Sequence, residues 1–173
     1  ACQDCNELLG FVKYILKDSD ADGKDIQRGD FFTGVNGTVL TVNNYRSLLF
    51  GDNLSYSLNM ASVQNGTLVE NGTVVELTKE ENFETDPIQV SKTLPLSGGE
   101  KVGYLMYNQF VADKSPNLNS VFADFKSEGI KDLVIDLRYN GGGSVRNCVE
   151  LASMIAGQFE GEIFAQEQWN SKL

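Results

Sequence analysis

Residues 132–143 read Asp-Leu-Val-Ile-Asp-Leu-Arg-Tyr-Asn-Gly-Gly-Gly, and this stretch decides the fold of the second half of the chain. Leu133–Leu137 is an apolar run interrupted only by Asp136, which is typical of a strand buried in a parallel sheet. The glycines end this run, and apolar residues then recur at helical spacing from Val145 to Ala156. The sequence therefore predicts a strand, a glycine turn and a helix in succession.

The flanking sequence extends this alternation in both directions. Lys101–Tyr107 has the pattern of a strand, Gly129 ends a helix that follows it, and Glu162–Ala165 predicts a further strand. The apolar face of the intervening helix repeats at i, i+3, i+4 and i+7: Leu118, Val121, Phe122 and Phe125. Strands that alternate with helices predict an α/β unit with a parallel sheet and right-handed crossovers.

The first half of the chain has a different pattern, made of short apolar runs separated by turn residues. Asn36-Gly37, Asn65-Gly66 and Asn71-Gly72 favour the positive φ angles of tight hairpin turns, which explains these Asn-Gly-Thr triplets without a sugar. The runs predict a small, mostly β domain, and the chain as a whole is predicted to be α+β. They are Phe11–Leu16, Phe31–Val35, Thr38–Val42, Ser55–Val63, Val74–Leu77 and Ile88–Val90.

Pro95-Leu96-Ser97-Gly98-Gly99 has the composition of a linker between two folding units. We therefore expect one domain over residues 1–95 and the first part of another over residues 96–173.

Composition excludes several classes of function. The 173 residues carry 14 Lys and Arg against 24 Asp and Glu, a net charge of −10, so a basic surface for nucleic acid is not expected. The chain has no histidine, which rules out a Ser-His-Asp triad and a histidine-ligated zinc. Its apolar runs are far shorter than the ~20 residues that a membrane span needs.

The three cysteines predict neither a metal site nor a cofactor. Cys2 and Cys5 form a C-x-x-C pair, but only Cys148 remains to join them, and a structural zinc needs four ligands. A disulfide between Cys2 and Cys5 stays open, whereas Cys148 is expected on the buried face of its helix.

Residues 18–23 match the first half of a calcium loop of the EF-hand type, with Asp18, Asp20, Asp22 and Gly23. The twelfth position, where a bidentate glutamate belongs, is Gly29. We interpret the loop as a polar turn, and a calcium-dependent adhesion module stays as an alternative.

The Asn140–Gly143 turn joins a strand to a helix, so its backbone amides could bind an anion. A dinucleotide fingerprint would need glycine where Arg146 stands, and the Gly-Lys-Ser/Thr of a P-loop is missing. Two interpretations stay open: amides that stabilise a developing oxyanion, or a tight turn that needs glycine for its backbone angles.

The Asp132–Gly143 stretch closely resembles the D-L-R-x-N-x-G-G motif of C-terminal processing (tail-specific) serine peptidases. Lys101–Leu105 is similar to the first strand of their catalytic domain, and Leu118–Gly129 to the helix before the motif. Asp25–Asp30 followed by Val35-Asn36-Gly37 resembles the core motif of the PDZ domain that these enzymes carry. The resemblance implies a PDZ-like domain followed by part of an α/β peptidase domain of the crotonase or Clp-protease type.

The resemblance also implies roles for individual residues. Backbone amides of Gly142 and Gly143 would belong to the oxyanion hole, and Asp136, Arg138 and Asn140 would hold the turn in shape. An alternative for Arg138 is a simple surface ion pair with an acidic neighbour. The serine nucleophile and lysine base of the family lie downstream of the motif, so we expect both outside this chain, and Ser144 does not occupy the nucleophile position.

In the PDZ-like half, Leu9, Gly10 and Phe11 resemble the loop that binds a peptide carboxylate, next to a strand that pairs with the peptide. Only one strand fits between Phe11 and Arg28, where a PDZ domain has two. Either the peptide-binding strand is cut away, or the domain is a reduced variant.

We therefore expect a fragment, itself inactive, of a peptidase that binds and cleaves unfolded or tagged chain ends. Its partners would be polypeptide C-terminal segments, and its location the bacterial periplasm, cell envelope or exterior, with a lipid anchor as an option. A non-catalytic peptide-binding protein with the same fold is the rival.

Overall fold

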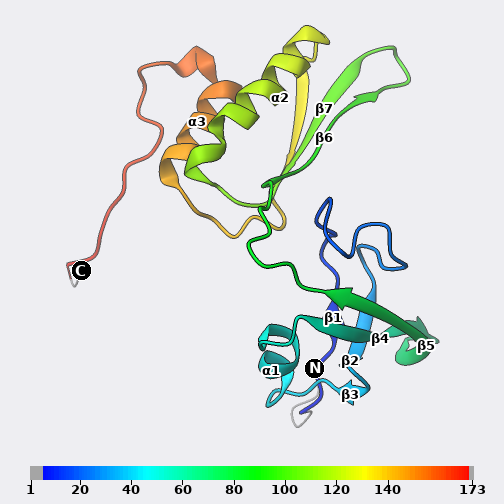
Figure 1. Ribbon diagram of the computed structural model, residues 1–173. Helices are drawn as coiled ribbons and strands as arrows, with labels where there is room; N and C mark the ends of the chain where they lie inside the picture. Colours follow the sequence, from blue (N-terminus) through cyan, green and yellow to red (C-terminus); the bar gives the residue numbers. More distant parts are fainter. Residues whose placement is uncertain (1–5, 172–173) are drawn as a thin grey trace. The chain divides into compact units, whose positions relative to one another are not determined.

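The computed structural model describes residues 6–171 of the chain, so the possible Cys2-Cys5 disulfide lies outside the described residues. Contacts between residues divide the chain into two compact units, residues 1–85 and 86–173 (Figure 1). Each unit has its own apolar core and a mixture of strands and helices. The α+β class predicted from the sequence is confirmed at this level.

The first unit is built on an antiparallel sheet in the order β1-β2-β4-β5, with β3 paired to β2. The strands are β1 (Gly10–Phe11), β2 (Phe31–Val35), β3 (Thr38–Val39), β4 (Ser55–Gln64) and β5 (Thr67–Thr78). A short helix that the strand patterns did not predict, α1 (Tyr45–Phe50), packs Leu48 and Leu49 against the core. The core side chains are Ile26, Phe32, Val35, Leu40, Leu58, Met60, Val75 and Leu77.

Two of the three predicted hairpin turns are confirmed. Asn36-Gly37 joins β2 to β3, and Asn65-Gly66 joins β4 to β5, with positive φ at all four residues. The third prediction is wrong, because Asn71-Gly72 lies inside β5, where the register with β4 shifts between Asn59 and Ala61. A glycine with positive φ serves a β-bulge as well as a turn, so the pair alone did not distinguish them.

Two predicted strands are shorter than expected. Of Phe11–Leu16 only Phe11 is in β1, and of Thr38–Val42 only the first two residues form β3. After Phe11 the regular ladder ends, although Val12 still bonds the segment before β2: Val12 N donates to Asp30 O, and Gly29 N donates to Val12 O.

The Asp18–Gly23 loop is the polar turn that we expected. Asp20 Oδ2 accepts from Lys24 Nζ at 2.7 Å and from Thr78 N at 2.6 Å, and Asp22 Oδ2 accepts from Asp18 N at 2.9 Å. The hydrogen bond from Lys24 is the main reason why the pKa of Asp20 is lowered. The carboxylates of Asp20 and Asp22 thus already accept hydrogen bonds from donors within the protein.

The second unit contains a three-stranded sheet in the order β6 (Ile88–Pro95), β7 (Lys101–Tyr107) and β8 (Asp132–Asp136). β6 and β7 are antiparallel, whereas β7 and β8 are parallel and are connected through the 3₁₀ turn η1 (Ala112–Lys114) and helix α2 (Ser115–Ser127). The parallel pairing and the helical crossover agree with the sequence prediction.

The predicted boundary at residue 95 is wrong. Residues 96–100 form the hairpin turn between β6 and β7, in which Leu96 N donates to Glu100 O at 2.8 Å and Gly99 has a φ of 83°. The boundary lies between Thr85 and Asp86. Turn-forming residues mark a chain reversal within a sheet as readily as a linker between domains.

Helix α2 uses the apolar face that was predicted for it, with Leu118 and Phe125 buried against β7 residues Leu105 and Tyr107. Gly129, with a φ of 72°, follows its end. The second helix, α3 (Val145–Ile155), is succeeded by the 3₁₀ turn η2 (Gly157–Phe159). Its Leu151 reaches the same core.

Two expectations for the end of the chain are not met. The predicted strand Glu162–Ala165 is absent from the described structure, and Ile163 and Phe164 are exposed there. Cys148 is a free thiol and only partly buried, not part of the core. Within residues 6–171, none of the helices is long and apolar enough to cross a membrane.

Candidate functional site

The glycine turn lies at the carboxyl end of the parallel strands. Phe110, three residues after β7, forms an isolated parallel bridge with Gly143. Phe110 N donates to Gly142 O at 3.0 Å, and Ser144 N donates to Phe110 O at 2.8 Å. The backbone of Phe110 therefore holds the turn on both sides of Gly143.

Asn140 fastens the other end of the turn. Its Nδ2 donates to the backbone oxygen of Tyr107 at 3.0 Å, and its Oδ1 accepts from Gly142 N at 2.8 Å. The backbone N of Asn140 also donates to Leu137 O at 2.9 Å. One side chain thus joins the end of β7 to the glycines.

Gly143 cannot be replaced by another residue without a shift of the backbone. Its φ is 134°, and a Cβ atom built on it would lie 2.1 Å from the carbonyl oxygen of Phe110. Its amide donates to no acceptor within the described part of the chain, and the residue is exposed. An N–H group that is fixed in direction and open to solvent is the element that an oxyanion site requires.

Gly142 has a different role from the one that we expected. Its φ of 102° also requires glycine, but its amide is already bonded to Asn140 Oδ1. Of the two amides that the sequence nominated, only that of Gly143 is open in this structure.

Asp136 and Arg138 form a closed ion pair at the end of β8. The Asp136 carboxylate accepts from Arg138 Nε at 2.9 Å and from Arg138 Nη2 at 2.5 Å, and it also accepts from Tyr104 Oη at 2.7 Å. The Asp136 side chain is 5% exposed, whereas that of Arg138 is 64% exposed. The hydrogen bonds from Arg138 and then from Tyr104 hold the pKa of Asp136 well below its usual range.

The same contacts affect the partners of Asp136. The hydrogen bond to Asp136 raises the pKa of Tyr104 and that of Arg138. The backbone N of Arg138 also donates to Asp136 Oδ1 at 3.1 Å. Arg138 therefore contacts Asp136 through both its side chain and its backbone, at the start of the turn.

Sequence reasoning missed three residues of this region. Tyr107 supplies the carbonyl that Asn140 binds, and Phe110 supplies both backbone bonds to the turn. Asn147 is fully buried in the first turn of α3, and its backbone N donates to Ser144 Oγ at 3.2 Å. The signal available in the sequence was the helical spacing of Asn147, four residues before the apolar Leu151. Ser144 caps α3 with its hydroxyl oxygen.

In the first unit, the predicted peptide-binding residues lie at the edge of the sheet. Gly10 and Phe11 form β1, which pairs with β2 through Gly10–Phe32 and Phe11–Phe31. β1 is the terminal strand of its sheet among the described residues, and Leu9 and Phe11 are exposed. An exposed edge strand can accept a peptide as an additional strand.

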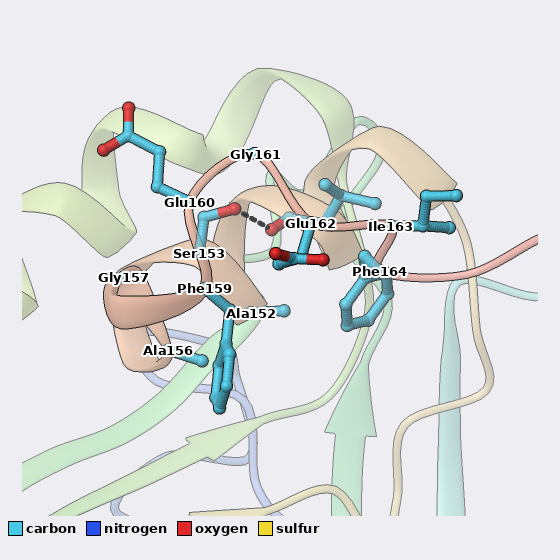
Figure 2. A pocket seen from close by; sticks show the side chains of 11 residues that line it. Ala152, Ser153, Ala156, Gly157, Phe159, Glu160, Gly161, Glu162, Ile163 and Phe164 are labelled. Atoms are coloured by element: carbon cyan, nitrogen blue, oxygen red, sulfur yellow. Dashed lines mark hydrogen bonds between the residues drawn. The ribbon is translucent and has the colours of Figure 1, made fainter.

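A cavity of about 890 Å³ lies away from the turn. It is walled by the carboxyl end of α3 and by residues 157–164 (Figure 2). Figure 2 shows Phe159 and Phe164 projecting around the small side chain of Ala152. The only hydroxyl of its lining, Ser153 Oγ, donates to Val149 O at 2.9 Å, and the lining contains no lysine or arginine. This cavity therefore offers no activated nucleophile.

The glycine turn lies in a segment that is similar to known proteins. The sequence model of Peptidase family S41 matches residues 101–172. A "Probable CtpA-like serine protease" from Staphylococcus epidermidis is 29% identical over 140 residues, which are 80% of this chain and 26% of the relative. The chain thus spans about a quarter of the length of the curated relatives that it matches.

Two solved structures resemble the fold. A putative S41 protease from Bacteroides fragilis has a TM-score of 0.66 and 27% identity, over 85% of this chain and 40% of the other. The photosystem II D1 C-terminal processing protease has a TM-score of 0.55 and 19% identity, over 87% of this chain and 43% of the other, and this likeness concerns the fold alone. Residues 101–172 thus match Peptidase family S41, and at this level the resemblance that the Asp132–Gly143 motif predicted is confirmed.

Proposed function

We propose that this chain is part of a C-terminal processing serine peptidase and supplies one donor of its oxyanion hole, the backbone amide of Gly143. The observation that carries this proposal is the fixed, open N–H of Gly143 between two backbone bonds to Phe110. Such a donor stabilises the negative oxygen that develops when a peptide carbonyl is attacked.

The nucleophile and the base would come from residues outside this chain. By resemblance to the family, a serine attacks the scissile carbonyl and transfers its proton to a lysine amine. The proton then passes to the leaving amine, and water hydrolyses the resulting ester. Within the chain, Asn140 and the Asp136–Arg138 pair would keep Gly143 N–H aimed at the reacting oxygen.

We propose that the first unit is PDZ-like and captures the end of an unfolded polypeptide. The exposed edge of β1, with Leu9, Gly10 and Phe11, supports this, because main-chain bonds along an open strand bind extended peptides with little sequence preference. A location in the bacterial periplasm or cell envelope, or outside the cell, is part of the same proposal.

Two measurements test the proposed function. The 173-residue chain and a longer protein that includes the downstream region are each incubated with a fluorophore-labelled unfolded peptide and with a serine-reactive fluorophosphonate. We expect labelling and turnover in the longer protein only. Labelling of Ser144 in the short chain would contradict the proposal, and peptide binding without turnover in the longer protein would favour a non-catalytic binding protein.

A further inference from the structure

A chain of polar side chains runs through the interior of the second unit. Tyr107 Oη donates to Asn147 Oδ1 at 2.7 Å, and Asn147 Nδ2 donates to Ser115 Oγ at 2.9 Å. The Ser115 hydroxyl donates to the carboxylate of Glu150, which also accepts from Arg146 Nε at 2.9 Å. We call these five residues the polar chain. It connects β7 with both helices.

Burial of the inner groups of the polar chain destabilises the folded state unless every one of them is hydrogen-bonded. Tyr107 and Asn147 are both 0% exposed, and burial raises the pKa of the Tyr107 hydroxyl. Apolar side chains of similar size would fill the same space without desolvation of polar groups. A fully bonded network instead permits only one arrangement of the elements that it joins. The polar chain therefore fixes α3 against β7 in a single position.

The two buried members of the polar chain also contact the glycine turn from opposite ends. Tyr107 accepts the hydrogen bond of Asn140 Nδ2 with its backbone oxygen, before the glycines. Asn147 donates its backbone N–H to Ser144 Oγ, after them. Gly143 lies between these two attachment points.

We propose that Tyr107 and Asn147 are positioning residues that hold the open amide of Gly143 in the direction needed to bind an oxyanion. The inference rests on the proposed function of the turn. Both residues are fully buried, so each would act on the turn through another residue: Tyr107 through Asn140, and Asn147 through Ser144. The outer members, Ser115 and Glu150, anchor Asn147 to α2 and along α3.

Amide hydrogen exchange, followed by NMR in the 173-residue chain, tests this role without any need for peptidase activity. Exchange of the Gly142 amide measures local opening of the turn, because this amide is bonded to Asn140 Oδ1. Exchange of the Leu105 amide, in the central strand of the sheet, measures opening of the whole unit. In Tyr107→Phe, which removes one hydroxyl, we expect Gly142 to exchange about tenfold faster and Leu105 to change much less. The Gly143 amide resonance should shift as well.

Equal acceleration at Gly142 and Leu105 would overturn the proposal, because it would show a loss of general stability only. An unchanged Gly142 amide in a folded Tyr107→Phe chain would overturn it too. Ser115→Ala breaks the polar chain farther from the turn and replaces Tyr107→Phe if that variant fails to fold. Ser153→Ala on α3 is the matched control, because this hydroxyl donates only to Val149 O of its own helix, and it should alter neither amide.

A kinetic measurement in the longer protein separates the two proposals. If the turn binds the oxyanion, Tyr107→Phe should lower kcat more than it changes KM, because the amide acts only as charge develops. Suppose that Tyr107→Phe accelerates exchange at Gly142, but that the unmodified longer protein has no peptidase activity at all. This result would contradict the proposed function, and the role of Tyr107 in holding the turn would still stand.

Discussion

The hydroxyl of Tyr104 on β7 lies 2.7 Å from Oδ2 of Asp136 at the end of β8, and it meets the carboxylate that Arg138 also binds. The parallel register places Tyr104 opposite Val134, two residues before Asp136 along β8, so the bond runs diagonally across the two strands. This contact fixes the direction in which the chain leaves β8 toward the glycines.

The first prediction concerns pH. Because the pKa of Asp136 is lowered in the folded state, its ion pair adds stability above the pKa of an unfolded aspartate, about 3.9. That contribution is lost as the pH falls below this value toward the folded pKa. We expect Asp136→Asn to flatten the acid side of the stability curve of the second unit, measured by urea unfolding between pH 7 and pH 3. Asp124→Asn on α2 controls for the loss of one charge, and an equal slope in the two variants would contradict the prediction.

The second prediction concerns Gly143. Gly143→Ala should destabilise the second unit by about 1–3 kcal/mol, because the new Cβ meets the carbonyl oxygen of Phe110 at a φ that favours glycine. The matched control is Gly141→Ala, where a Cβ meets no atom within 4 Å and φ is not positive. Thermal unfolding compares the two. Similar melting temperatures for both variants would contradict the close approach of Phe110.

The third prediction concerns Asn108, which is 8% exposed and whose Oδ1 accepts no hydrogen bond among the described residues. Asn108→Leu should leave stability unchanged or raise it by up to about 1 kcal/mol, because the buried acceptor is desolvated without compensation. Asn147→Leu is the contrasting variant and should cost about 1–3 kcal/mol, because it breaks two bonds in the interior. Urea unfolding followed at the Leu105 amide measures both. A large loss in Asn108→Leu would point to a donor that occupies this position.

The fourth prediction concerns the boundary between the units. Residues 79–87 have no regular secondary structure and are mostly exposed, so limited proteolysis should cut there first. The 96–100 turn should be cut later, because it is closed by the β6–β7 hairpin. Mass spectrometry of the early fragments distinguishes the two positions. First cuts at residues 96–100 would contradict this prediction and support a linker there, as the sequence suggested.

The fifth prediction concerns calcium. Low millimolar calcium should not raise the melting temperature of the first unit, because Lys24 and the Thr78 amide already occupy Asp20 and the loop has no closing glutamate. Binding to the folded state raises stability by mass action, so differential scanning calorimetry is sensitive to a tight site. A rise of several degrees that magnesium does not reproduce would favour the adhesion alternative.

Local sequence determined the elements whose signals are short in range. The i, i+3, i+4 spacing of α2, the apolar run of β8 and the turns at Asn36-Gly37 and Asn65-Gly66 were all predicted, because side-chain periodicity and positive φ act within a few residues. The motif at Asp132–Gly143 also predicted a candidate site at the glycine turn, and the roles of its residues stay predictions.

Tertiary structure decided everything that depends on which segments meet. The Asn71-Gly72 bulge, the hairpin at residues 96–100 and the exposed Glu162–Ala165 segment follow from strand pairing, which no local pattern specifies. The same holds at the site, where Gly142 and Gly143 are alike in sequence. The amide of Gly142 donates to Asn140 Oδ1. The backbone of Phe110, 33 residues from Gly143 in sequence, bonds Gly142 O and Ser144 N instead and leaves the amide of Gly143 without an acceptor among the described residues. Only folding brings Phe110 and Tyr107 to the turn, and they distinguish two glycines that the sequence treats as equivalent.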